Sequence, residues 1–172
     1  MSEFTPAYTV LRRLEGGYLE DPPGYDTYAG ICRKWWPHSA IWVYVDTEKP
    51  LSNGQKLKNN RSELVVESFY FDKYWDKTPL SSINKQDVAT FIFCQSINEG
   101  DEAVKVAQRI VGCKDDGVLG PVTVQHINEF ESDLVAKMAE DTIEFYREVA
   151  KAHPEKEKDL NGWINRVNNI IT

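Results

Sequence analysis

Residues 14–31 read Leu-Glu-Gly-Gly-Tyr-Leu-Glu-Asp-Pro-Pro-Gly-Tyr-Asp-Thr-Tyr-Ala-Gly-Ile, and the interpretation of the whole chain depends on this stretch. Its first residues lie at the end of a predicted helix. Thr5 suits the N-cap of that helix and Pro6 suits its first turn, so we predict a helix from about Pro6 to Glu15. Gly16 and Gly17 are expected to end it, because the residue past a helix end often takes a positive φ.

Glu15 falls in the last turn of this predicted helix, beside carbonyl groups that lack an intrahelical partner. The negative end of the helix dipole disfavours an ionised carboxylate there by about 0.3–1 kcal/mol. A general acid must hold its proton at the working pH, so Glu15 is a candidate for that role. The alternative is a surface glutamate that merely precedes the helix end, and helix mechanics alone leaves both interpretations open.

The same stretch resembles a known family. Glu15-Gly16-Gly17-Tyr18, Asp21-Pro22, Gly24, Thr27 and Gly30-Ile31 resemble the signature of the glycoside hydrolase family 108 muramidases, which are also known as secretion activators. The resemblance continues in the same order through residues 33–37, 42–46, 71–76, 93–100, 116–123 and 162–167. It therefore spans nearly the whole chain.

The resemblance implies an N-acetylmuramidase, a lysozyme-like enzyme that cleaves the glycosidic bond between N-acetylmuramic acid and N-acetylglucosamine. Glu15 would be the general acid. A second group must activate water or stabilise the developing cation, and Thr27, Asp26 and Asp21 all stay open for that role. Substrate contacts are expected at Tyr18, Asp21, Tyr28, Trp42, Trp75 and Asn98. The resemblance implies neither a cofactor nor a metal.

Apolar residues at helical spacing predict further helices over about residues 60–76, 84–100, 101–112, 120–128, 131–152 and 155–171. Phe145, Trp163 and Ile171 are expected on buried helix faces. Asn60 with Glu63 has the pattern of a capping box. Residues 41–45 have the β-branched and aromatic bias of a short strand. The expected fold is mainly α, a lysozyme-like helical fold with a small irregular or β lobe.

The resemblance also suggests two parts. Residues 1–112 resemble the lysozyme-like catalytic part, and residues 113–172 resemble a peptidoglycan-binding helical part. The connection near 113–116 is too short for an independent linker, so we expect the two parts to pack as one compact unit.

Composition narrows the classes of partner. The net charge of the 172 residues is −7, and no Lys/Arg block is dense enough to neutralise a row of phosphates, which argues against nucleic-acid binding. No apolar run reaches the roughly 18–20 residues needed for membrane insertion. Cys32, Cys94 and Cys113 are widely spaced and predicted to be buried thiols, and with three scattered histidines they form no metal-binding pattern.

The expected partner is therefore the glycan strand of peptidoglycan. The N-terminal residues have neither a basic nor an apolar stretch typical of a signal peptide, so we expect synthesis in the cytoplasm and action on the wall by an export route that is not encoded here. Two other functions stay open: a lytic transglycosylase, and a non-catalytic peptidoglycan-binding secretion helper.

Overall fold

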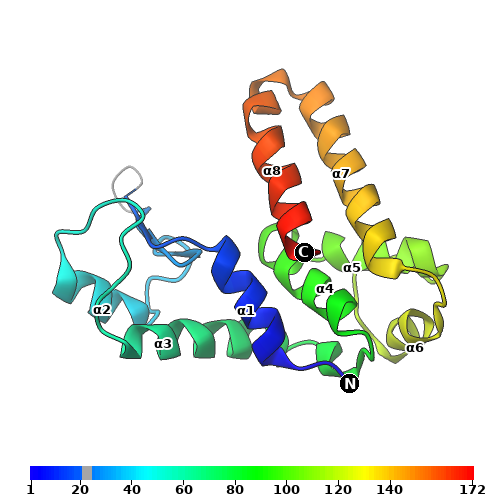
Figure 1. The fold of residues 1–172 in the computed structure, drawn as a ribbon, viewed down its shortest axis with the longest axis horizontal. Helices are drawn as coiled ribbons and strands as arrows, with labels where there is room; N and C mark the ends of the chain where they lie inside the picture. Colours follow the sequence, from blue (N-terminus) through cyan, green and yellow to red (C-terminus); the bar gives the residue numbers. More distant parts are fainter. Residues whose placement is uncertain (21–24) are drawn as a thin grey trace. The chain divides into compact units, whose positions relative to one another are not determined.

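The computed structural model describes residues 1–20 and 25–172. Within them the protein is mainly α with one small antiparallel sheet, which confirms the predicted fold class (Figure 1). Contacts divide the chain into two compact units, one formed by Leu11–Lys73 and the other by Met1–Val10 with Tyr74–Thr172. The boundaries fall inside helix α1 (Phe4–Leu14) and inside the π-helical turn η1 (Phe71–Trp75). The division at residue 112 stays a prediction.

The unit Leu11–Lys73 contains the end of α1, a three-stranded sheet, and helices α2 (Ile41–Glu48) and α3 (Arg61–Tyr70). The strands are β1 (Tyr18–Leu19), β2 (Thr27–Tyr28) and β3 (Ile31–Cys32), in the order β1-β2-β3. The register pairs Tyr18 with Tyr28, and Tyr28 with Ile31. These three side chains are buried, and they form the inner face of the sheet.

A two-residue turn, Ala29-Gly30, joins β2 to β3. The φ angles are 50° at Ala29 and 77° at Gly30. Positive φ at both central residues is the type I′ geometry, whose twist matches that of a hairpin. Glycine takes this conformation at no steric cost, whereas alanine in it costs roughly 1–2 kcal/mol.

Helix α1 begins at Phe4, before the predicted N-cap Thr5, and it ends one residue before the predicted end at Glu15, for a different reason than the one expected. Neither Gly16 nor Gly17 has a positive φ. A Cβ on Gly17 would instead collide with the carbonyl of Gln55, whose oxygen accepts a 2.8 Å hydrogen bond from the Tyr18 amide. Gly17 is therefore required for close backbone approach, and Gly16 has nothing within 4 Å of a Cβ.

The strand predicted over residues 41–45 was wrong, since these residues form helix α2. Ile41, Trp42 and Val45 are buried on one side of that helix, and Val43 is 69% exposed. The burial follows a helical period, and packing of this face outweighs the β propensity of the residues. The sheet lies instead in the stretch 18–32, much of which was predicted as loop.

The other unit contains most of the helices. They are η2 (Pro79–Ser82), α4 (Gln86–Glu99), α5 (Glu102–Val111), α6 (Pro121–Glu129), α7 (Leu134–Ala152), η3 (Pro154–Lys156) and α8 (Glu157–Ile170). Helix α4 is buried on all sides from Val88 to Gln95. Helices α7 and α8 pack antiparallel, side by side (Figure 1). Gly100 and Gly112, both at positive φ, end α4 and α5.

Gln108 fixes the loop that leads into α6. Its side chain is buried, and its amide donates to Asp116 at 3.0 Å, to the Val118 carbonyl at 3.1 Å and to Thr123 at 3.1 Å. Its amide oxygen accepts from the Gly117 amide at 2.9 Å. Loop and helix are thus held together by one saturated polar side chain.

Several local predictions were wrong. Phe145 is 43% exposed at the edge of the apolar face of α7, and Ile171 is 44% exposed because it lies just past the end of α8. Asn60 makes no capping hydrogen bond through its side chain. Of the three cysteines, which are all free thiols, Cys94 is buried and the other two are half-buried.

Candidate active site

Glu15 directly follows α1. Its amide donates to the Leu11 carbonyl at 2.9 Å, and its own carbonyl accepts from Arg12 Nη1 at 2.9 Å. The arginine thus satisfies one of the carbonyls that a helix end leaves without a backbone partner. The backbone of Glu15 is therefore fixed at both its donor and its acceptor.

The side chain of Glu15 lies against the turn between β2 and β3. A Cβ on Gly30 would lie 2.5 Å from Glu15 Oε2 and 2.5 Å from the Tyr70 hydroxyl. The carboxylate and the phenol hydroxyl therefore flank the same point of the turn, and only glycine leaves room for both.

The turn itself is held from two sides. The Tyr70 hydroxyl donates to the Ala29 carbonyl at 2.7 Å, and the Ala29 amide donates to the Gly17 carbonyl at 3.3 Å. These bonds hold Ala29 in its left-handed conformation. Strained residues of this kind cluster at functional sites and persist where the surrounding structure over-determines them.

An ion pair between Arg12 and Glu63 of α3 stabilises the region around Glu15. Arg12 donates to both carboxylate oxygens of Glu63, at 2.9 Å each, and the Tyr28 hydroxyl lies 3.5 Å from the same carboxylate. The Arg12 guanidinium lowers the pKa of Glu63. The bidentate pair connects the last turn of α1 to α3.

Asp26 lies in a cluster of charges. Lys49 Nζ is 2.6 Å from its carboxylate, and Arg33 Nε is 3.6 Å away. Arg33 also pairs with Asp46, at 3.1 Å from Nη1, and this hydrogen bond lowers the pKa of Asp46. The Asp26 carboxylate is thus held in ion pairs by two cations.

Thr27 lies in β2, in the same hairpin as Gly30, and its hydroxyl donates to the Tyr25 carbonyl at 3.2 Å. The register pairs it with Leu19 and Cys32, on the more exposed face of the sheet. A threonine hydroxyl keeps acceptor capacity when it donates. The candidate Asp21 lies outside the described residues.

Four aromatic side chains predicted to contact substrate are buried: Tyr18, Tyr28, Trp42 and Trp75 are between 0% and 5% exposed. Trp42 donates from its indole nitrogen to the Trp36 carbonyl at 2.7 Å, beneath the Arg33 guanidinium. Packing in the protein interior thus accounts for the burial of these four rings.

Two of the predicted residues, Trp75 and Asn98, belong to the unit that includes Tyr74–Thr172. Trp75 packs edge-to-face on Phe4 and Phe93, with ring centroids 5.7 and 5.6 Å away. Asn98, with its amide oxygen turned toward Arg166, accepts from Arg166 Nη2 at 3.1 Å.

Trp35, which is not among the predicted site residues, is 70% exposed. The ammonium of Lys34 lies 4.9 Å from the Trp35 ring and 4.3 Å from the Tyr25 ring, and it donates to the Tyr25 hydroxyl at 2.7 Å. A half-exposed tyrosine, an exposed tryptophan and a cation thus form a surface cluster in the same unit as Glu15. Its exposure in the structure distinguishes Trp35 from the half-buried Trp36 and the buried Trp42.

In the part of the chain that the structure describes, no group of three or more His, Cys, Asp or Glu side chains could hold a metal ion. None of the described helices is both long enough and apolar enough to cross a membrane.

Comparison with known proteins gives the class of the chain. Residues 8–100 match the family model described as glycosyl hydrolase 108, so the protein is of the glycoside hydrolase kind. Because the match covers more than half of the chain, the protein belongs to the glycosyl hydrolase 108 family. Residues 102–168 match a second model, described as a predicted peptidoglycan domain.

The fold also resembles a solved structure, titled as that of Brucella abortus SagA. The TM-score is 0.67 at 23% sequence identity, over 98% of this chain and 91% of that chain. A search of curated proteins gave no match.

Proposed function

We propose that the protein is an N-acetylmuramidase that hydrolyses the bond between N-acetylmuramic acid and N-acetylglucosamine in peptidoglycan, with Glu15 as general acid. The observation that carries the proposal is the position of the Glu15 carboxylate, at a helix end and against a rigid turn. A carboxyl group held in this way can protonate the glycosidic oxygen as the bond to the leaving sugar breaks.

For the second role we propose Thr27. Its hydroxyl lies on the more exposed face of the hairpin whose turn touches Glu15, and it can accept a hydrogen bond from a water that attacks the sugar. Asp26 is the less suitable candidate, because Lys49 and Arg33 neutralise its charge.

For sugar binding we propose the exposed ring of Trp35. An indole face contacts the C–H groups of a sugar ring, and the nearby Lys34 ammonium suits the carboxylates of the wall polymer.

The test is wall lysis by Glu15→Gln, measured as the fall in turbidity of purified peptidoglycan. Glutamine keeps the size of the side chain but cannot donate the carboxyl proton, so lysis should fall by about 10²–10⁴-fold. Glu140→Gln is the matched control, since Glu140 is an exposed residue of α7. A Glu15→Gln variant that keeps a tenth or more of the lysis rate would exclude Glu15 as the acid.

Product analysis separates the rival functions. Hydrolysis adds one water to each cleaved bond, whereas a transglycosylase releases an anhydro sugar that is lighter by that water. A protein that sediments with peptidoglycan but releases no fragment would be a non-catalytic binder, which is the function that the match to a peptidoglycan domain would favour in that case.

A further inference from the structure

A groove of about 400 Å³ lies between the start of α2 and one face of α3, within the unit Leu11–Lys73. Most of its lining is apolar, and the rest consists of two hydroxyl groups and one pair of opposite charges. The lining residues are Ser39, Ala40, Leu64, Val65, Ser68, Phe69, Asp72 and Lys73.

The face of α3 that lines this groove points away from the candidate active site. The α3 residues of the lining recur at intervals of one, three and four positions, so they share one side of the helix. Glu63 lies on the opposite side and pairs with Arg12. Tyr70 also lies there and donates to the Ala29 carbonyl. A molecule bound in the groove therefore leaves these contacts intact.

Exposed apolar side chains extend the groove into a surface patch. Leu64 is 62% exposed, and Val43, one helical turn beyond Ala40, is 69% exposed. Phe69 is half-buried, and its ring packs edge-to-face on the Trp36 ring, with the centroids 5.1 Å apart. The α2–α3 patch is the surface formed by Ala40, Val43, Leu64, Val65 and Phe69. Apolar surface of this kind is stabilised when another molecule covers it.

The net charge of the unit that carries the α2–α3 patch does not oppose self-association. Residues 11–73 include nine Lys or Arg and nine Asp or Glu, so their formal net charge is zero. The whole net charge of −7 therefore belongs to the other unit. Two copies that meet through the neutral unit bring no excess of like charge together at the contact.

One carboxylate and one ammonium stand side by side at the end of the groove, since Asp72 and Lys73 are both exposed. Within residues 1–20 and 25–172, neither of them forms a salt bridge. Two copies related by a two-fold axis present the same surface to each other, so Asp72 of each copy can face Lys73 of the other. The charges at this end of the groove are therefore complementary to those of a second copy.

We propose that the α2–α3 patch is a dimerisation surface, on which a second copy of this chain docks about a two-fold axis. The exposed Leu64 of each copy covers apolar lining of the other, and Asp72 and Lys73 form two ion pairs at the edges of the contact. Both candidate active sites stay open in this dimer, because the groove lies on the side of α3 away from the Tyr70 hydroxyl. Dimerisation of this kind requires no catalytic activity.

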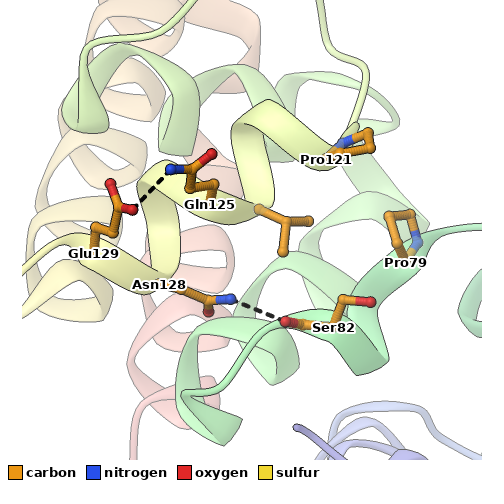
Figure 2. Close-up of a pocket in the computed structure, with 7 residues that line it drawn as sticks. Pro79, Ser82, Pro121, Gln125, Asn128 and Glu129 are labelled. Carbon is orange, nitrogen blue, oxygen red and sulfur yellow. Dashed lines mark hydrogen bonds between the residues drawn. The ribbon is translucent and has the colours of Figure 1, made fainter.

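A second groove, in the unit that includes Tyr74–Thr172, is the reference surface. It encloses about 480 Å³ between η2 and α6, and its polar side chains bond to groups of its own walls (Figure 2). Asn128 donates to the Ser82 carbonyl at 3.0 Å, and Gln125 donates to Glu129 at 2.8 Å. Glu129 is the charged residue of its lining, so two copies docked there would bring like charges together.

The experiment is sedimentation equilibrium of the full chain from about 10 to about 500 µM, with a thiol reductant because the described cysteines are free. The weight-average mass should rise over this range from that of one chain toward that of two. Leu64→Glu places a carboxylate in the apolar contact and should weaken association about tenfold or more. Val122→Glu is the matched control, since Val122 is 63% exposed and lies beside the second groove, and it should associate as wild type does.

Exchange of the two charges tests the two-fold geometry. Asp72→Lys and Lys73→Asp, each studied alone, should weaken association about fivefold or more, because like charges then meet across the axis. An equimolar mixture of the two variants restores both ion pairs and should associate at least as tightly as wild type. The proposal is overturned by a chain that stays monomeric up to about 500 µM, by loss of association in Val122→Glu, or by a mixture no tighter than its separate components. A monomeric chain in which Leu64→Glu instead weakens binding to glycan strands would assign the patch to sugar.

Discussion

The Tyr70 hydroxyl, at the end of α3, donates a 2.7 Å hydrogen bond to the carbonyl of Ala29, a residue with a φ of 50°. The bond joins residues 41 positions apart, and it holds the turn against which the Glu15 carboxylate lies. Tyr70 thus acts on the proposed acid through the backbone of the turn, as a positioning residue.

Tyr70→Phe removes this bond and keeps the ring. The buried Ala29 carbonyl loses a donor, so the free energy of unfolding should fall by about 1 kcal/mol. The turn should also become less well fixed, and we expect a lower kcat, by about tenfold, with little change in KM. Kinetics on soluble glycan strands, together with thermal unfolding, measure both effects. Tyr44→Phe, on the partly exposed side of α2, is the control and should behave as wild type.

Gly30→Ala tests the steric requirement of the turn. The added Cβ would lie 2.5 Å from both Glu15 Oε2 and the Tyr70 hydroxyl, at a φ of 77° that alanine adopts only with strain. We expect about 1–3 kcal/mol of destabilisation and loss of at least about 100-fold in lysis, because the carboxylate must move.

Gly16→Ala is the comparison for this variant, since nothing lies within 4 Å of a Cβ at that position and its φ is not positive. It should lyse peptidoglycan at close to the wild-type rate. Equal losses in Gly16→Ala and Gly30→Ala would contradict the steric explanation.

Trp35→Ala should weaken glycan binding, whereas Trp42→Ala should lower the stability of the fold. Trp35 is 70% exposed, so its removal should leave the melting temperature within a few degrees of wild type and weaken binding to glycan strands by about tenfold. Trp42 is 4% exposed, so its removal should cost about 3–5 kcal/mol of stability. Thermal unfolding and co-sedimentation with glycan strands separate the two. If Trp35→Ala binds glycan as wild type does, Trp35 does not contact sugar.

The Arg12 to Glu63 pair predicts a pH dependence of stability. Arg12 lowers the pKa of Glu63 in the folded state, so the pair stabilises the fold above the unfolded-state pKa. The contribution is lost as pH falls from the unfolded-state pKa through the lower, folded-state pKa.

Glu63→Gln should therefore be less stable than wild type at pH 7, by about 1 kcal/mol because the carboxylate is half-exposed, and the difference should shrink toward pH 3. Urea unfolding at several pH values measures it. A difference that is the same at pH 7 and pH 3 would show that the charge pair is not its cause.

The long helices were predictable because their apolar residues repeat at 3.6 positions. The sheet was not, since strands of two residues have no period to detect. Helix α2 was mistaken for a strand because its composition of Ile, Trp, Val and Tyr favours β structure, while burial of one face decided otherwise.

Only the part of the candidate site that comes from one short stretch of sequence could be predicted. Glu15 and the turn at Gly30 lie within 16 positions of each other and could be proposed from one stretch. Tyr70 and Glu63 come from α3, and their side chains have the spacing of ordinary helix residues. No local signal distinguishes a tyrosine that holds a turn from one that fills a core.

The glycines around Glu15 are under unequal constraint. Gly17 lies against the Gln55 carbonyl and Gly30 against the Glu15 carboxylate, whereas a side chain at Gly16 would have open space. Over long divergence, position 16 is therefore expected to drift among relatives, and glycine is expected to persist at 17 and 30. Of the two adjacent glycines in the Glu-Gly-Gly-Tyr stretch, only Gly17 should therefore help to recognise relatives by sequence.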